Sequence, residues 1–132
     1  MARFKLLIDT DIIIDVLKGV RSANELFRFQ EIDICCSILS KKELLSKKGL
    51  SDTERKRIEN LLTQVKVFRV DNDIASKYQQ LLAKYGEKPE TIVDFIIAAT
   101  AWSKKLPLLT RNRKHFENIE EITLSPAYKA ER

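Results

Sequence analysis

Two aspartates in apolar surroundings are the first residues of this chain that could do chemistry. Asp9 directly follows the apolar run from Phe4 to Ile8, and Asp94 lies among the isoleucine, valine and phenylalanine residues of segment 92–97. A carboxylate in such surroundings costs free energy unless it has partners. Asp9 could cap the next helix and Asp94 could belong to a buried salt bridge, but the same positions suit a reaction site. Both are therefore candidate catalytic residues.

Two further polar residues have a structural explanation and a chemical one. Glu43 lies three residues after Ser40, which is the spacing of a capping box, so a helix cap alone would account for it. Asn112 follows the short apolar pair at 108–109, where a turn would also favour asparagine. Glu43 and Asn112 complete the set of candidate catalytic residues.

The residues around Asn112 offer groups that could bind a phosphate. Thr110 has a hydroxyl, and Arg111 and Arg113 carry guanidinium groups that can pair with phosphate oxygens. These three residues are the predicted contacts to a substrate phosphate.

Acids contributed by separate elements predict a divalent cation. Asp9, Glu43 and Asp94 would repel one another at one edge of a sheet unless a cation joined them, and Asp11 and Asn112 are further candidate ligands. Oxygen ligands favour Mg²⁺ or Mn²⁺. A cation of this kind can activate water for attack on a phosphodiester. The acids therefore favour phosphodiester hydrolysis.

The nitrogen and sulfur ligands in the chain exclude a zinc-finger site. His115 is the single histidine, and the two cysteines, Cys35 and Cys36, are adjacent. Neither pattern gives the paired spacing that such sites need. Neighbouring cysteines also suit a reducing compartment better than a disulfide-bonded secreted scaffold.

The elements that must position these residues alternate between strands and helices. Apolar runs predict strands at 4–8, 32–37, 65–70, 108–109 and 121–124. Capping residues, glycines and one proline predict helices at 12–18, 22–30, 51–64, 71–85 and 89–105, a helix that starts near Ser40, and a helical turn at 114–118. The alternation predicts an α/β fold with a parallel sheet of about five strands and helices on both faces. In such sheets ligands bind beyond the carboxyl ends of the strands.

Length and composition indicate one domain of ordinary globular type. The 132 residues are 44% hydrophobic, so we expect a single domain over 1–132, with a polar C-terminal tail at about 126–132. Lysine and arginine outnumber aspartate and glutamate by 24 to 19, a charge of +5 that favours a polyanionic partner and equally suits a solvated surface. No apolar segment approaches the about 20 residues that span a bilayer, and no signal peptide is visible. We expect a cytoplasmic protein without a membrane partner.

The order of these motifs resembles the PIN-domain nucleases, and within them the VapC-type toxins. The opening LLIDTDIIIDVLKG resembles the first motif, with its acid at Asp9, and SILSKKELL resembles the second, with its acid at Glu43. The segment DFIIAATAWSKKLPLLTRNRKHF is similar to the third and fourth motifs, with Asp94 and Asn112 at their polar positions. The resemblance covers nearly the whole chain, and this last stretch is its most specific part.

The resemblance implies a Mg²⁺- or Mn²⁺-dependent endoribonuclease that is the toxin of a toxin–antitoxin pair. It also implies a cognate antitoxin that blocks the enzyme, and usually a homodimer. The chain departs from many relatives at Asn112, where they carry aspartate, so a second metal position is open to question. Asp11 replaces a residue that is often uncharged, and it could be a ligand or a helix cap.

Two other functions remain as alternatives. The opening LLIDTD also resembles haloacid-dehalogenase-type phosphatases, but Ile13 stands where a hydroxyl residue is expected and the chain leaves little room for a cap domain. A non-catalytic domain for RNA or a protein partner would use basic residues to bind phosphates and would need no metal. Its basic candidates are Lys41, Lys42, Arg111, Arg113 and Lys114.

Apolar residues early in the chain predict a protein interface. Segment 12–17 and the following Leu26, Phe27 and Phe29 exceed the needs of one core, and buried aromatic residues often anchor interfaces. We expect these faces to contact a second copy or an antitoxin.

Overall fold

A four-stranded parallel sheet forms the centre of the fold. The computed structural model describes residues 3–86, 92–126 and 128. The strands lie in the order β3-β2-β1-β4, and all three pairings are parallel. Their bounds are β1 Phe4–Ile8, β2 Ile32–Ser37, β3 Lys66–Phe68 and β4 Leu108–Leu109. Because the strands are parallel, their carboxyl ends meet at one edge of the sheet, as the sequence predicted.

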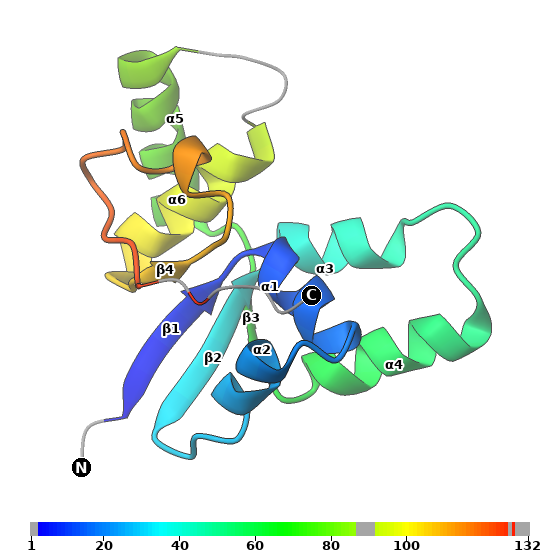
Figure 1. Ribbon diagram of the computed structural model, residues 1–132. Coiled ribbons are helices and arrows are strands. Elements are labelled where there is room, and N and C mark those ends of the chain that lie inside the picture. The colour runs from blue at the N-terminus through cyan, green and yellow to red at the C-terminus, as the bar shows by residue number, and fades with distance from the viewer. Residues whose placement is uncertain (1–2, 87–91, 127, 129–132) are drawn as a thin grey trace.

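Helices cover both faces of the sheet, which confirms the predicted layer arrangement (Figure 1). Helices α5 and α6 pack on one face, and α1, α3 and α4 pack on the other. The helices are α1 Thr10–Leu17, α2 Arg21–Leu26, α3 Ile38–Leu45, α4 Asp52–Leu62, α5 Asn72–Tyr85 and α6 Ile92–Lys104, with a 3₁₀ turn η2 at Arg113–His115.

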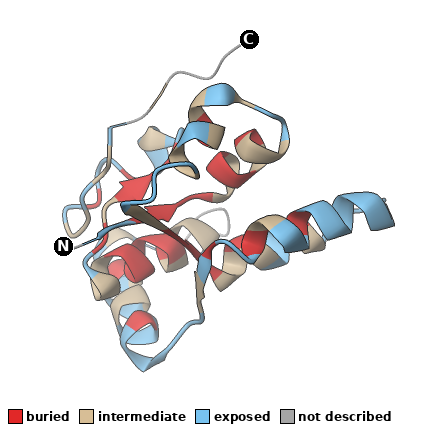
Figure 2. Cartoon of the chain, turned by 90° about the horizontal axis from the view of Figure 1, so that it is seen from below, coloured by how far each residue is buried: buried red, intermediate tan, exposed pale blue. Residues whose placement is uncertain are grey.

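Alternate residues of the central strands enter two separate cores. Leu6 and Ile8 of β1 face the core beneath α1, α3 and α4, whereas Leu7 faces the core beneath α5 and α6. The two cysteines divide in the same way, Cys36 with the first core and Cys35 with the second, and both are buried and unpaired. In Figure 2 the buried residues gather on the sheet and on the helix surfaces that face it. Strands buried on both faces explain the continuous apolar runs in the sequence.

The predicted fifth strand is reduced to an isolated β-bridge. Segment 121–124 forms no strand, and Leu124 makes only an isolated parallel bridge to Leu108. Its backbone is nevertheless tied to β4, because Leu108 N donates to Thr123 O and Ser125 N donates to Leu108 O. The sheet therefore has four strands among the described residues, with its β4 edge covered by this segment.

Of the two predicted capping boxes, one is confirmed in its serine cap. Ser51 caps α4, because its Oγ accepts from Glu54 N at 3.1 Å and lies 3.2 Å from Glu54 Oε1. Asp71 caps α5 as predicted, and Gly86 ends that helix with a positive φ of 89°. Pro89, predicted in the first turn of the next helix, lies outside the described residues.

The other predicted capping box is wrong. Helix α3 begins at Ile38 and not near Ser40, because Ser37 at the end of β2 is its N-cap and accepts from Leu39 N. Ser40 therefore lies inside the helix, and its side chain is buried. Glu43 has no capping role, so the structural explanation for this glutamate fails.

No helix in the described part of the chain is long and apolar enough to cross a membrane.

Candidate active site

Asp9 lies at the carboxyl end of β1 with both carboxylate oxygens held. Its Oδ1 accepts from Thr10 N at 2.7 Å, and its Oδ2 accepts from the Thr110 hydroxyl at 2.7 Å. The residue is 5% exposed. Asp9 is also the N-cap of α1, which begins at Thr10 and so earlier than predicted. Capping and a site role are compatible here, because the cap fixes the carboxylate at the edge of the sheet.

Glu43 turns toward the start of α1. Its Oε1 accepts from the Thr10 hydroxyl at 3.0 Å, and the same hydroxyl lies 2.9 Å from Ser40 Oγ. Thr10 is the residue next to Asp9, so this contact brings the second predicted acid to the same edge as the first. Glu43 itself is exposed to solvent.

Asp94 lies in the first turn of α6 and points toward the turn that follows β4. Its Oδ2 accepts from His115 Nδ1 at 2.9 Å, with the Asp94 side chain 19% exposed and that of His115 57% exposed. Burial raises the pKa of the Asp94 carboxyl, and the negative charges of Asp9 and Glu43 raise it further, whereas His115 lowers it. The three acids therefore influence one another, as the sequence predicted for acids at one edge.

The predicted phosphate contacts are used inside the protein. Thr110 has no exposed surface. Its hydroxyl donates to Asp9 and accepts from Asn112 N at 3.0 Å. The prediction that Thr110 contacts a phosphate directly is corrected on this ground. The Arg111 side chain pairs with Asp15, and Arg113 Nη1 donates to Ser125 O at 2.8 Å. Arg111 and Arg113 are thus already engaged in the fold.

Asn112 is exposed to solvent near Thr110, and its side chain does not cap the 3₁₀ turn that follows. It is the N-cap of η2, but its side chain makes no capping hydrogen bond. The turn explanation offered for asparagine therefore receives no support from its side chain.

Asp11 and Asp15, one turn apart on α1, have different surroundings. Asp15 is buried, where the Arg111 guanidinium binds both of its oxygens at 2.7 and 2.9 Å and the Tyr128 hydroxyl donates at 2.8 Å. Asp11 Oδ2 accepts from Arg111 N at 2.9 Å, but its buried Oδ1 has no hydrogen-bond partner among the described residues. Burial, and then the charge of Asp9, raise the pKa of Asp11 to about 6. Asp15 is structural, whereas Asp11 carries an uncompensated oxygen beside Asp9.

The donor set fits a hard divalent cation. Carboxylates supply the oxygens that Mg²⁺ and Mn²⁺ bind, and the orphaned Asp11 Oδ1 beside Asp9 is an acceptor in need of positive charge. Across residues 3–86, 92–126 and 128, no three His, Cys, Asp or Glu side chains are already gathered as a metal-binding group. The acids that would hold the ion are Asp9, Glu43 and Asp94, with Asp11 and Asn112 as further candidates.

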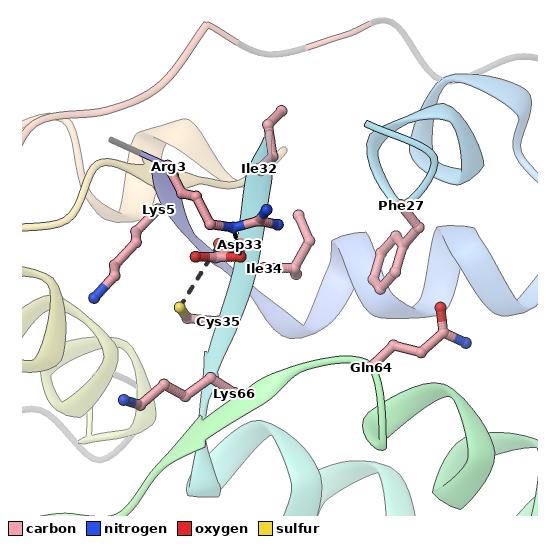
Figure 3. Close-up of a pocket in the computed structure, with 9 residues that line it drawn as sticks. All are labelled: Arg3, Lys5, Phe27, Ile32, Asp33, Ile34, Cys35, Gln64 and Lys66. Atoms are coloured by element: carbon pink, nitrogen blue, oxygen red, sulfur yellow. Dashed lines mark hydrogen bonds and ion pairs between the residues drawn. The ribbon is translucent and has the colours of Figure 1, made fainter. Parts of the chain in front are cut away.

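Two of the hollows in the surface differ in their relation to the acids. One of about 540 Å³ lies between α1, α3 and α4 and includes Thr10 and Glu43 in its lining. Another, of about 340 Å³, lies at the amino ends of the strands, and its lining includes Lys5, Lys66 and the ion pair of Arg3 with Asp33 (Figure 3). None of the predicted site residues lines this second hollow, whereas Glu43 lines the first.

Sequence reasoning missed two polar partners of the acids. Thr10 lies directly after Asp9 in the first motif, but its type and position give no sign of a contact with Glu43. His115 was considered only as a lone histidine unable to form a zinc site. The only sign in the sequence of a role for His115 was its position three residues after Asn112. That position does not reveal that the imidazole ring contacts Asp94.

The comparisons with known proteins place this geometry in a family. The family model described as PIN domain matches residues 6–122. Ribonuclease VapC19 of Mycobacterium tuberculosis is 35% identical over 128 residues, which cover 92% of this chain and 98% of that protein. Ribonuclease VapC1 of Methanocaldococcus jannaschii is 27% identical over 124 residues, covering 91% of this chain and 85% of that protein.

Solved structures agree with the sequence relatives. A chain of a toxin–antitoxin complex from Klebsiella pneumoniae has a TM-score of 0.74 and 27% identity, over 93% of this chain and 99% of that one.

Proposed function

This chain belongs to the PIN domain family, and from that premise we propose that it is the ribonuclease toxin of a toxin–antitoxin pair. The reaction is hydrolysis of RNA phosphodiester bonds with Mg²⁺ or Mn²⁺ as cofactor. The proposal rests on contacts that link the acids. Thr10, next to Asp9, donates to Glu43, and the segment after β4 contacts both Asp9 and Asp94. Like charges gathered in this way favour a bound dication.

Each acid is held by a partner that fixes its direction. Thr110 and the Thr10 backbone orient Asp9, the Thr10 hydroxyl orients Glu43, and His115 contacts Asp94. When bound, a divalent cation supplies Lewis acidity that generates a water-derived nucleophile and neutralises phosphate charge. The protein's own task is to hold its carboxylates in place and to seat the phosphodiester beside them.

The basic turn after β4, at residues 111–115, is suited to bind the RNA backbone. Asn112, Lys114 and His115 are exposed there and line a shallow hollow together with the partly engaged Arg111 and Arg113. Cations beside an acidic centre attract phosphates and keep them within reach of the acids. Arg113 retains donors beyond the one bound to Ser125, so it remains a proposed phosphate contact.

The partner is a cognate antitoxin that binds the groove between α1, α3 and α4. Half-buried Ile14, Leu17 and Leu50 line this groove, and Thr10 with Glu43 places it next to the acids. A partner segment with apolar side chains fits it, and a basic side chain of that segment can reach Glu43. Ile12 and Ile13, predicted at an interface, are instead fully buried in the core, whereas Phe29 is 57% exposed and remains available for a partner or a second copy.

Incubation of total RNA with the purified protein tests the proposal. We expect cleavage with Mg²⁺ or Mn²⁺, none with EDTA, and recovery when the metal is restored. RNA binding without cleavage under every condition would instead favour the non-catalytic alternative. Cleavage of a small phosphomonoester with no effect on RNA would favour the phosphatase alternative.

A further inference from the structure

We propose that His115 is a positioning residue that holds Asp94 in the direction the active site needs. The inference rests on the proposed function, because it concerns how one of the acids is presented to the cation. His115 Nδ1 lies 2.9 Å from Asp94 Oδ2. A carboxylate can only accept, so the ring nitrogen carries the proton and donates it. One oxygen of Asp94 is thereby fixed, and this sets the direction of the other.

Core residues anchor both members of the pair. Phe116 follows His115 and is fully buried, and Phe95 follows Asp94 and is 6% exposed. Both phenylalanines belong to the same core, beneath α5 and α6. Packing of these two neighbours therefore fixes the backbone positions of the histidine and the aspartate, while the imidazole itself is 57% exposed.

The same short segment orients other acids of the site. Between positions 110 and 115, Thr110 donates to Asp9, the backbone of Arg111 donates to Asp11, and His115 donates to Asp94. A segment that holds three carboxylates by three different donors acts as one support for the site. His115 is its last member and its single imidazole.

The electrostatics explain why Asp94 needs such a donor. Burial, Asp9 and Glu43 all disfavour the charged form of Asp94 and raise its pKa, and the contact with His115 opposes them. Donors behind metal-binding side chains typically account for about 10- to 100-fold in metal affinity or activity. Loss of the His115 donor should therefore weaken cation binding even though it removes a group that can carry positive charge.

Titration of Mn²⁺ into the purified 132-residue chain by calorimetry tests the inference without an activity assay. We expect His115→Leu to weaken Mn²⁺ binding by about tenfold or more. His115→Asn should restore most of the affinity, because its amide nitrogen reaches the place of Nδ1. Lys114→Gln removes a cation from the same turn and should leave Mn²⁺ affinity at or slightly above that of the wild type. Thermal melts of all four proteins in EDTA report whether each variant is folded.

Several results would overturn the inference. Unchanged or tighter Mn²⁺ binding by folded His115→Leu would show that the ring does not position Asp94. A rise in KM for RNA with unchanged Mn²⁺ affinity would make His115 a substrate contact instead. If wild type itself bound no Mn²⁺, the proposed function would fail together with this inference. Normal wild-type binding with an unaffected His115→Leu variant would overturn the inference alone.

Discussion

The hydroxyl of Thr10 donates to Oε1 of Glu43 at 3.0 Å, although 33 residues separate them in the chain. The contact joins the start of α1, where Asp9 lies, to α3. It replaces the capping role that the spacing of Ser40 and Glu43 predicted. A glutamate whose spacing predicted a role in its own helix instead contacts the residue next to Asp9.

The contact between Thr10 and Glu43 gives the first prediction. Thr10→Val removes the donor while keeping the shape, so Glu43 loses its orientation and RNA cleavage should fall by about tenfold or more. Thr10→Ser keeps the hydroxyl and should retain most of the activity. The two kcat values, measured on one RNA at saturating Mg²⁺, make the comparison. Equal rates in the valine and serine variants would show that the Thr10 hydroxyl does not orient Glu43 for cleavage.

Neutralising Asp94 should not destabilise the protein in the absence of metal. Burial and the charges of Asp9 and Glu43 raise the pKa of Asp94, so its charged form is disfavoured in the folded state. Asp94→Asn should therefore keep or raise the Tm in EDTA, and it should lose the gain in Tm that Mn²⁺ gives to the wild type. A large fall in Tm in EDTA would show that Asp94 is a structural ion-pair partner.

Asp11 predicts a pH dependence of stability. Its pKa of about 6 in the folded protein exceeds the ordinary aspartate value of 3.8, so the folded state binds the proton more tightly than the unfolded state. The stability from this difference is fully present below about pH 4 and is lost as the pH rises through about 6. Asp11→Asn should raise the Tm at pH 7 in EDTA, and this gain should shrink toward pH 4. Thermal melts from pH 4 to 7.5 measure it, and a gain that grows toward low pH would contradict the assignment.

Arg111 should matter for stability more than its neighbour Arg113. Arg111→Met leaves the Asp15 carboxylate, whose side chain is 4% exposed, without its guanidinium partner. We expect a loss of about 2 to 3 kcal/mol in the free energy of unfolding, below the cost for a fully buried pair because Arg111 is itself 37% exposed. Arg113→Met loses one bond to a carbonyl and should cost about 1 kcal/mol. Equal losses in urea unfolding would show that the pair with Asp15 adds nothing.

Local patterns predicted the sheet and singled out two acids as candidates because those signals lie within a few residues. Asp9 was identified from the buried strand before it, and Asp94 from the apolar residues around it. The parallel sheet with helices on both faces followed from the alternation of strands and helices. The family resemblance is confirmed by the match to the PIN domain model over residues 6–122.

The errors arose where distant parts of the chain decide the structure. The start of α3 was misplaced because Ser37, the last residue of β2, competes with Ser40 for the cap. The burial of Thr110 and the contact of His115 with Asp94 depend on how the segment after β4 folds over the ends of β1 and α6. The spacing of residues within the segment after β4 does not predict that this segment contacts Asp9 and Asp94.

The rate of RNA cleavage by Asp9→Asn, Asp94→Asn and the double variant, at one Mg²⁺ concentration, tests directly whether the two acids form one metal-dependent centre. If the two acids act as one metal-dependent centre, each single variant should lose nearly all activity, and the double variant should be no slower than the worse single variant. Folded single variants that cleave RNA at the wild-type rate, or losses that multiply in the double variant, would contradict a shared centre.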